Sequence, residues 1–145
     1  LCEDTEGFVL VLDFQDEQHK SLVENIKHFA KVKFNTTIND IFRMNIVYLP
    51  ANTQYNENYH MFPHVDTFDF PHKNLLYYFY DNDAETIFFN QKFENDVNKV
   101  SFEKQEIIKK IKPKQGRAAM FNGWIFHAAA VSKINKRVTL NINFV

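Results

Sequence analysis

The tripeptide His64-Val65-Asp66 carries the residue types that most directly suggest chemistry in this sequence. In an extended segment, side chains two positions apart share a face, with their Cβ atoms about 6.5 Å apart along the strand. An imidazole and a carboxylate at that spacing can converge on one metal ion, at about 2 Å each. Because His-x-Asp arises readily by chance, the tripeptide alone predicts a candidate metal site and no more.

Two residues far downstream strengthen this interpretation. His127 opens the apolar segment HAAAV, whose small alanines leave room beside an imidazole. Arg137 follows ten residues later and begins the alternating segment RVTLNINFV. One face of that strand would carry Arg137, Thr139, Asn141 and Asn143, and the other only apolar side chains. A wholly polar face meets solvent or lines a polar cavity, and the arginine at its head together with the preceding histidine favours the cavity.

The elements that must position these residues are mostly short strands. Alternating apolar residues and flanking turn residues predict strands at 7–13, 42–49, 75–80, 85–89, 117–121, 126–131 and 137–145. Apolar residues at helical spacing predict one helix from about Asp16 to just before Phe34, with Asp13 or Asp16 as its cap. Residues 107–112 fit a strand or a short helix, and residues 90–98 fit a loop.

This pattern indicates a mainly β protein, an all-β barrel or sandwich supported by an N-terminal helix. We expect a single domain over residues 1–145, with a strand and helix in 1–41 and the β core in 42–145. Hydrophobic residues make up 45% of the chain and only three residues are glycine, which indicates a packed core.

Charge and hydropathy exclude several function classes. The net charge of −1 gives no overall attraction for nucleic acid or an anionic membrane. The apolar runs are too short to cross a bilayer, and no signal peptide is recognisable. The single cysteine, Cys2, cannot form an internal disulfide, so nothing requires an oxidising compartment. We therefore expect a soluble, cytoplasmic protein.

The order of the segments resembles that of the Fe(II)- and 2-oxoglutarate-dependent oxygenases, in particular the prolyl-hydroxylase type. The matching pieces are VYLP at 47–50, HVD at 64–66, LLYYFY at 75–80, ETIFF at 85–89, PKQGRAAMF at 113–121, FHAAAV at 126–131 and RVTLNINF at 137–144. The resemblance covers about residues 42–145. One departure is DNDA at 81–84, where members of the family usually have a pair of glycines.

The resemblance implies a double-stranded β-helix, the jelly-roll barrel that cupins share. In that fold His64, Asp66 and His127 would hold Fe(II) as a triad of two histidines and one carboxylate. It further implies a dioxygenase that consumes O2 and 2-oxoglutarate, releases succinate and CO2, and hydroxylates a peptidyl (prolyl-like) side chain or a small molecule. Halogenating relatives have a small residue in place of Asp66, so the carboxylate favours hydroxylation. Ascorbate is a candidate reductant.

Carried over by position, the resemblance also assigns residues to 2-oxoglutarate. Arg137 would bind the C5 carboxylate, because guanidinium offers a permanent charge and two parallel donors. Tyr78 would lie beside it, and Tyr48 would lie near the end that chelates iron. Thr139, the next residue of the polar row, is expected at the same subsite. Core or interface packing is the alternative role for both tyrosines.

Two other functions stay open at this level. The first is a cupin-like metal-binding barrel that uses no 2-oxoglutarate; Arg137 and Tyr78 discriminate against it, since such a barrel needs no carboxylate clamp. The second is a binding module that has lost catalysis. His60 and His72 flank the HVD motif but are expected in loop or surface positions. Residues 51–62 lack a period and are expected to form a mobile lid or substrate loop.

Overall fold

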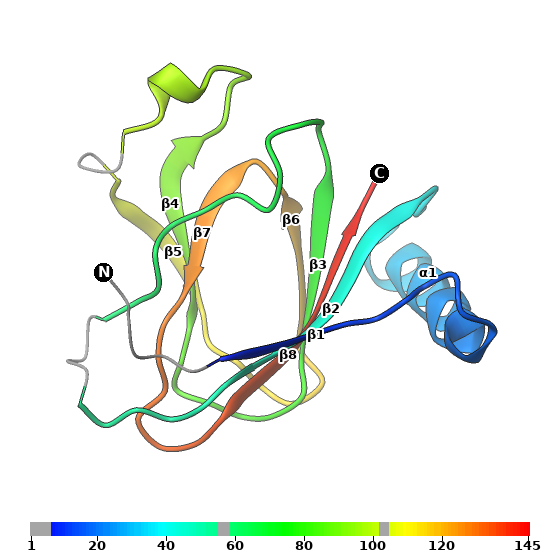
Figure 1. The fold of residues 1–145 in the computed structure, drawn as a ribbon, viewed down its shortest axis with the longest axis horizontal. Coiled ribbons are helices and arrows are strands. Elements are labelled where there is room, and N and C mark those ends of the chain that lie inside the picture. The colour runs from blue at the N-terminus through cyan, green and yellow to red at the C-terminus, as the bar shows by residue number, and fades with distance from the viewer. Residues whose placement is uncertain (1–6, 55–58, 102–104) are drawn as a thin grey trace.

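The computed structural model describes residues 7–54, 59–101 and 105–145. Its elements are β1 (Phe8–Val11), η1 (Glu17–His19), α1 (Lys20–Phe34), β2 (Ile41–Leu49), β3 (Lys73–Tyr78), β4 (Thr86–Lys92), η2 (Val97–Lys99), β5 (Ile107–Ile111), β6 (Ala118–Asn122), β7 (Ile125–Ala129) and β8 (Arg137–Phe144). They form a five-stranded sheet in the order β1-β2-β8-β3-β6 and a three-stranded sheet in the order β5-β4-β7. The two sheets face each other as the walls of a barrel (Figure 1).

The last strand, β8, is the centre of the larger sheet. It pairs antiparallel with β2 on one side, from Ile41↔Phe144 to Leu49↔Arg137, and with β3 on the other. Its polar side chains face the barrel interior, since Arg137, Asn141 and Asn143 line the central cavity. The polar cavity predicted from the alternation of this strand is therefore confirmed.

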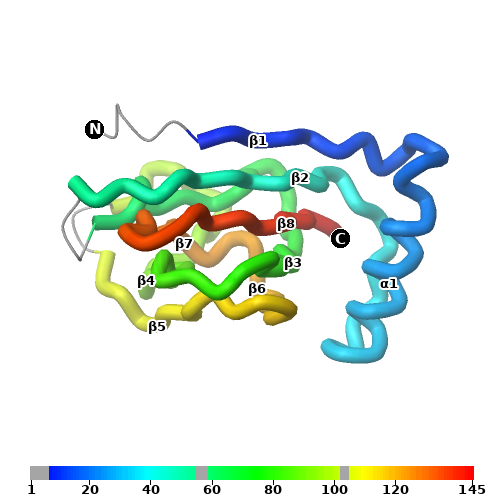
Figure 2. The backbone as a smooth tube through the Cα atoms, turned by 90° about the horizontal axis from the view of Figure 1, so that it is seen from below, coloured from blue at the N-terminus to red at the C-terminus, as the bar shows by residue number. Residues whose placement is uncertain are grey.

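One end of the opposite face of the larger sheet is covered by α1. Leu140, Ile142 and Phe144 are buried there together with Ile26 and Ala30 of the helix. The helix ends at Phe34 because Asn35 adopts a left-handed conformation, with a φ of 48°. Figure 2 shows α1 lying across one end of the sheet, beyond β2, while β1 forms the outer edge. The helix thus supports the strands that carry the polar row.

A second core stabilises the smaller sheet. Phe126 and Ala128 of β7 pack with Ile87 and Phe89 of β4 and with Trp124. Because side chains alternate along β7, His127 points to the other face, toward the cavity. The strand that carries the distal histidine is therefore fixed by apolar contacts on its outer side.

The segment that contains the HVD motif runs beside β7. Isolated bridges join His60 to Ala130 and His64 to His127, both antiparallel. This arrangement adds a short, irregular strand to the edge of the smaller sheet and brings two predicted metal ligands together.

Most predicted elements are present; one open choice is resolved and two details differ. Residues 107–111 are a strand, β5, which settles the choice left open by the sequence. Part of the predicted 90–98 loop is strand, because β4 continues to Lys92. Asp16 caps the short helix η1 instead of α1 itself. Among the described residues, no helix has the length and apolar character needed to span a membrane.

Candidate metal and cosubstrate site

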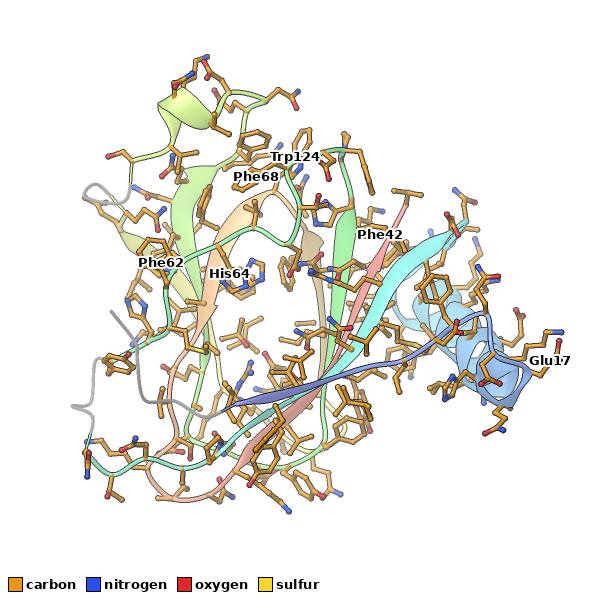
Figure 3. All side chains as sticks on the ribbon, in the orientation of Figure 1. Glu17, Phe42, Phe62, His64, Phe68 and Trp124 are labelled. Atoms are coloured by element: carbon orange, nitrogen blue, oxygen red, sulfur yellow. The ribbon has the colours of Figure 1, made fainter. Side chains whose placement is uncertain are left out.

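The structure brings His64, Asp66 and His127 together at one point of the barrel. One possible ligand atom from each residue can be chosen so that all lie within 4.8 Å of one another. His64 and His127 exchange two backbone hydrogen bonds of 3.0 Å each, so their side chains project from directly opposed positions. Their ring centroids are 4.7 Å apart. Figure 3 shows the His64 side chain directed toward the space between the two sheets.

Both imidazoles are oriented by backbone carbonyls. The Nδ1 of His64 is 3.0 Å from the Phe62 carbonyl oxygen, and the Nδ1 of His127 is 3.0 Å from the Ile125 carbonyl oxygen. A carbonyl can only accept, so each Nδ1 carries a proton and Nε2 is the nitrogen left as a possible metal donor. Histidines that bind metals are commonly oriented in this way by a second hydrogen bond.

Burial keeps His127 in the neutral form that a metal ligand requires. Loss of solvent, followed by the nearby His64, lowers the pKa of His127 to about 4. Phe121 packs against the imidazole, with ring centroids 5.0 Å apart, and excludes water from that side. At neutral pH the Nε2 of His127 can therefore bind a metal without first losing a proton.

Asp66 is held by three polar side chains. Arg43 Nη2 forms an ion pair with its Oδ1. Asn74 Nδ2 and Asn143 Nδ2 donate to its Oδ2, the latter at 2.9 Å. Burial acts to raise the pKa of Asp66. The positive charges of His127, which is protonated only at acid pH, and of Arg43, together with the Asn143 hydrogen bond, outweigh burial, so the pKa is lowered. The carboxylate is thus ionised and fixed in orientation.

Arg137 lies at the other end of the polar row and is fully enclosed. It is only 5% exposed, and its Nη2 donates to Thr86 Oγ1 at 2.9 Å. The same Thr86 oxygen is 2.6 Å from the hydroxyl of Tyr78, whose ring lies 5.8 Å from the guanidinium carbon. Burial lowers the pKa of Arg137 and raises that of Tyr78. Among the described residues no carboxylate forms an ion pair with Arg137.

Several buried polar atoms near Arg137 have no hydrogen-bond partner. They are Arg137 Nε, Thr139 Oγ1, Asn141 Oδ1 and Asn45 Oδ1. Register places Asn45 and Asn141 side by side, because they pair across β2 and β8. Arg137, Asn45 and Asn141 line a cavity of about 330 Å³ that is also lined by His64, Asp66 and His127. Unsatisfied buried groups are rare, so their concentration in one cavity indicates a place for a polar ligand.

Tyr48 is not where the sequence predicted it. Side chains of β2 alternate, and Val47 and Leu49 point into the cavity. Tyr48 therefore points outward and packs against Phe8, with ring centroids 6.0 Å apart. The structure corrects the expectation that this tyrosine lies near the chelating end. Thr139 is completely buried and pairs with Tyr78 in the strand register. It is not among the residues that line the cavity, and its place at the cosubstrate subsite stays a prediction.

His72 was expected in a loop or on the surface; it lies in the loop before β3, but it is buried. Only 5% of its area is exposed, and its ring lies so close to Gly123 that a Cβ there would come within 2.0 Å of Nε2. Gly123 is therefore required by this packing. His60 is half-buried, with its ring 5.4 Å from that of Phe89. Neither residue joins the metal-ligand cluster.

Sequence reasoning missed three residues of this site. Arg43 and Asn74 bond to the carboxylate of Asp66, and Thr86 joins Arg137 to Tyr78. Thr86 lies in the ETIFF segment and Arg43 is one of only three arginines, so there was a reason in the sequence to consider both as site residues. Asn74 carried none, because it precedes the strand that the sequence predicted.

No protein-family model matches the chain, and no curated protein matches its sequence. Solved structures do match it. One is SnoN, a non-heme α-ketoglutarate-dependent epimerase from nogalamycin biosynthesis, with 12% identity, a TM-score of 0.64, and coverage of 94% of this chain and 60% of that one. A second is an oxidoreductase of the 2OG-Fe(II) oxygenase family from Burkholderia pseudomallei, with 13% identity, a TM-score of 0.63, and coverage of 99% and 69%.

A third similar structure is a prolyl hydroxylase from Trichoplax adhaerens, in complex with a peptide fragment of the oxygen degradation domain of hypoxia inducible factor. It has 12% identity and a TM-score of 0.61, and the match covers 99% of this chain and 64% of that one. This chain therefore spans about two thirds or less of the first similar structures. At such identities the likeness concerns the fold, and the chain has the double-stranded β-helix fold of Fe(II)/2-oxoglutarate oxygenases.

Proposed function

We propose that this chain is an Fe(II)- and 2-oxoglutarate-dependent dioxygenase. The observation that carries the proposal is Arg137, a buried guanidinium with no carboxylate partner among the described residues, in the same cavity as a His-Asp-His cluster. An unpaired buried charge is costly, and a bound carboxylate would remove that cost. A dicarboxylate that reaches from Arg137 to the cluster satisfies both ends of the cavity.

The residues of the cluster fit iron. Two neutral imidazoles and one ionised carboxylate are the donor set of non-haem Fe(II) oxygenases, and His64, Asp66 and His127 are the residues that would hold the ion. When bound, Fe(II) would supply oxygen activation coupled to the conversion of 2-oxoglutarate to succinate and CO2. The chain itself keeps His127 neutral and Asp66 ionised, so neither ligand needs a change of protonation at neutral pH.

The cosubstrate would be held by its far carboxylate. Arg137 supplies the charge, Tyr78 the hydroxyl, and Thr86 fixes both groups through its single oxygen. The unpaired oxygens of Asn45 and Asn141, which line the same cavity, are available along the length of the ligand. A cupin-like metal barrel without 2-oxoglutarate would leave these oxygens and the charge of Arg137 without a partner, and this counts against that alternative.

The substrate would approach past His64, which is exposed at the edge of the cluster. Three aromatic side chains of the segment around the HVD motif are exposed: Phe62 is 65%, Phe68 43% and Phe70 39% exposed. Figure 3 shows Phe62 to the left of His64 and Phe68 above it. We infer a substrate with an apolar part, either a peptidyl (prolyl-like) side chain or a small molecule, that is hydroxylated at a C–H bond. The predicted lid over residues 51–62 stays a prediction, since residues 55–58 lie outside the described part.

The direct test is turnover of 2-oxoglutarate. The protein is incubated with Fe(II), O2 and 2-oxoglutarate, with and without ascorbate, and succinate is measured across a panel of proline-containing peptides and small apolar metabolites. Succinate above the level of an Asp66→Ala control supports the proposal. If calorimetry detects metal binding but no binding of 2-oxoglutarate, the metal-barrel alternative becomes the better interpretation.

A further inference from the structure

The first strand, β1, is an open edge of the larger sheet. Among the described residues it pairs only with β2, over Phe8 to Val11, and no strand lies on its other side. Figure 2 shows β1 as the outermost strand, beyond β2. Its four residues, FVLV, are all apolar and are between 59% and 70% exposed. Proteins normally block an apolar edge of this kind with charge or cover it with another segment.

The other edge strands in the described part of the protein are protected. β6, at the opposite edge of the larger sheet, has no exposed apolar residue. β5, at one edge of the smaller sheet, carries the exposed Lys109 and Lys110, and lysines on an edge oppose pairing with a further strand. β7, at the other edge, is bordered by the segment of His60 and His64. β1 has neither kind of protection.

The hydrogen bonds between β1 and β2 identify the backbone groups at the open edge. Just beyond the end of β1, the Leu12 amide donates to the Met44 carbonyl at 2.8 Å. In an antiparallel pair every second residue bonds to the partner strand, so Leu10 also bonds to β2. The amide and carbonyl groups of Val9 and Val11 therefore point to the open edge. Groups repeated at this spacing are matched by another extended peptide backbone.

The open edge borders the cavity that the metal-ligand cluster lines. Val9 lies opposite Val47 and Val11 lies opposite Asn45 in the strand register. Directly opposed residues share a face of a sheet, and Val47 and Asn45 line the cavity together with Val9. A strand added to β1 would therefore extend this wall of the cavity, with every second side chain on the cavity side.

We propose that the open edge of β1 binds an extended polypeptide by strand addition, alongside the cavity. In the proposed oxygenase this polypeptide carries the side chain to be hydroxylated, and to that extent the inference rests on the proposed function. A second copy of this chain fits the edge less well. Stable interfaces between proteins bury roughly 1,200 Å² or more, and a strand of four residues offers only part of that area. A peptide needs less area, because the adjoining cavity can hold one of its side chains.

The test measures peptide binding separately from turnover. The probe is a synthetic library of short, capped peptides of randomised sequence, applied to immobilised protein that is loaded with Mn(II) and 2-oxoglutarate. Mass spectrometry identifies the retained peptides, and calorimetry measures the affinity of the most strongly retained one.

Val11→Pro is the decisive variant. It removes the Val11 amide proton, which points away from β2, so β1 keeps its pairing with β2. The affinity for the selected peptide should fall by about tenfold or more, because a main-chain hydrogen bond is lost and the proline ring obstructs the edge. Val11→Thr keeps both the amide and the shape of the side chain, and it should bind the peptide as the wild type does.

Amide hydrogen exchange of the wild type gives a second measurement, in case Val11→Pro does not fold. Without peptide, the amides of Val9 and Val11 should exchange rapidly and the amide of Leu10 slowly. The selected peptide should slow exchange at both valines by about tenfold or more, because it supplies acceptors for their amides.

Three results would overturn the inference and leave the proposed function intact. They are equal peptide affinity in Val11→Pro and wild type, valine amides that the peptide leaves unprotected, and a library from which no peptide binds. A concentration-dependent dimer in sedimentation that Val11→Pro abolishes would assign the edge to a second copy, and would also overturn the inference. Peptide binding at β1 without succinate formation from Fe(II), O2 and 2-oxoglutarate would overturn the proposed function and leave the docking edge standing.

Discussion

The two ends of the central cavity are lined by one polar row but differ in how their polar groups are satisfied. At one end, Arg43, Asn74 and Asn143 all hydrogen bond with Asp66. At the other end, Arg137 Nε and its neighbour Thr139 Oγ1 are buried without partners. The metal-ligand end is therefore complete before any ligand binds, whereas the arginine end is completed only by a ligand.

This difference indicates a division of labour along the cavity. Side chains that are already fixed in position favour metal binding, because they lose little conformational freedom when the metal binds. Each buried polar group without a partner costs roughly 1–3 kcal/mol of stability. The unpaired groups at the arginine end therefore lower the stability of the unliganded protein and are available to bind a ligand. Substitutions at the Asp66 end should therefore affect metal binding. Substitutions at the Arg137 end should affect the binding of 2-oxoglutarate and the stability of the unliganded protein.

The largest effect is expected from His127→Ala. This change removes one of three metal donors from a buried position. The affinity for Mn(II), or for Fe(II) without oxygen, should fall by more than about 100-fold, because the loss of a ligand exceeds the loss caused by removing a residue that only hydrogen bonds to a ligand. Isothermal titration calorimetry measures it. His60→Ala serves as the control, because His60 lies outside the cluster. Similar losses in the two variants would refute the assignment of His127.

Arg137→Ala should separate the two ends of the cavity. The loss of a charge-assisted, bidentate contact is expected to raise the dissociation constant of 2-oxoglutarate by about 100-fold, while metal affinity changes little. Arg137→Lys should lose less, since lysine keeps the charge but not the planar fork. Arg117→Ala is the matched control, because Arg117 is exposed and its guanidinium donates only to the Lys112 carbonyl among the contacts described. Unchanged 2-oxoglutarate binding in Arg137→Ala would disprove the carboxylate clamp.

The sequence predicted some residues of the site better than others for a physical reason. Asp66, His64 and Arg137 follow from alternation within single segments, which a strand's own residues encode. Arg43 reaches the site through a bulge, which depends on pairing between β2 and β8. Tyr48 was misplaced because resemblance supplied its role, whereas alternation from Val47 sets its direction.

The strands and the helix were also predicted from local sequence patterns. The strand segments and the helix carry their periodicity locally, so their existence could be read from the chain. The β-helix itself was inferred from the order of motifs, since sheet order requires contacts between distant strands such as β8 and β3. Local sequence contains no direct record of that pairing.

The stability of the metal-free protein should depend on the protonation of His127. Its pKa falls from 6.5 to about 4 on folding, so the unfolded chain binds more protons between these values. The free energy of unfolding should therefore rise with pH from about 4 to 6.5, by an amount on the order of 2 kcal/mol. Urea unfolding at several pH values, with a chelator present, measures this slope. His127→Gln should flatten the slope, whereas the control His28→Gln, on the exposed side of α1, should leave it unchanged. An unchanged slope in His127→Gln would show that the burial of His127 does not cause the pH dependence.

Thr86→Val should produce a smaller loss at the Arg137 end. The hydroxyl of Thr86 bonds to both Arg137 and Tyr78, and valine keeps the shape without the oxygen. Arg137 and Tyr78 would lose their common orienting partner, so 2-oxoglutarate affinity should fall by about tenfold. Thr36→Val, which removes a hydroxyl bonded to the Phe34 carbonyl outside the cavity, is the control. Equal affinity of Thr86→Val and wild type would show that Thr86 does not orient the clamp.

The smallest expected effect, and the one that tests the comparison most directly, comes from Thr139→Val. Thr139 is completely buried and its hydroxyl has no partner, so valine removes an unsatisfied group while preserving shape. The free energy of unfolding without ligand should increase by about 1 kcal/mol, whereas Thr86→Val should decrease it, because there two buried partners are left unpaired.

Saturating Mn(II) and 2-oxoglutarate should abolish the advantage of Thr139→Val, because the ligand supplies the wild-type hydroxyl with a partner that valine cannot use. Urea unfolding with and without ligands measures both quantities. If Thr139→Val and Thr86→Val changed stability in the same direction, the Arg137 end would not be the unsatisfied half of the cavity. If the gain persisted with ligand bound, Thr139 would lie beside the cosubstrate subsite without contacting it.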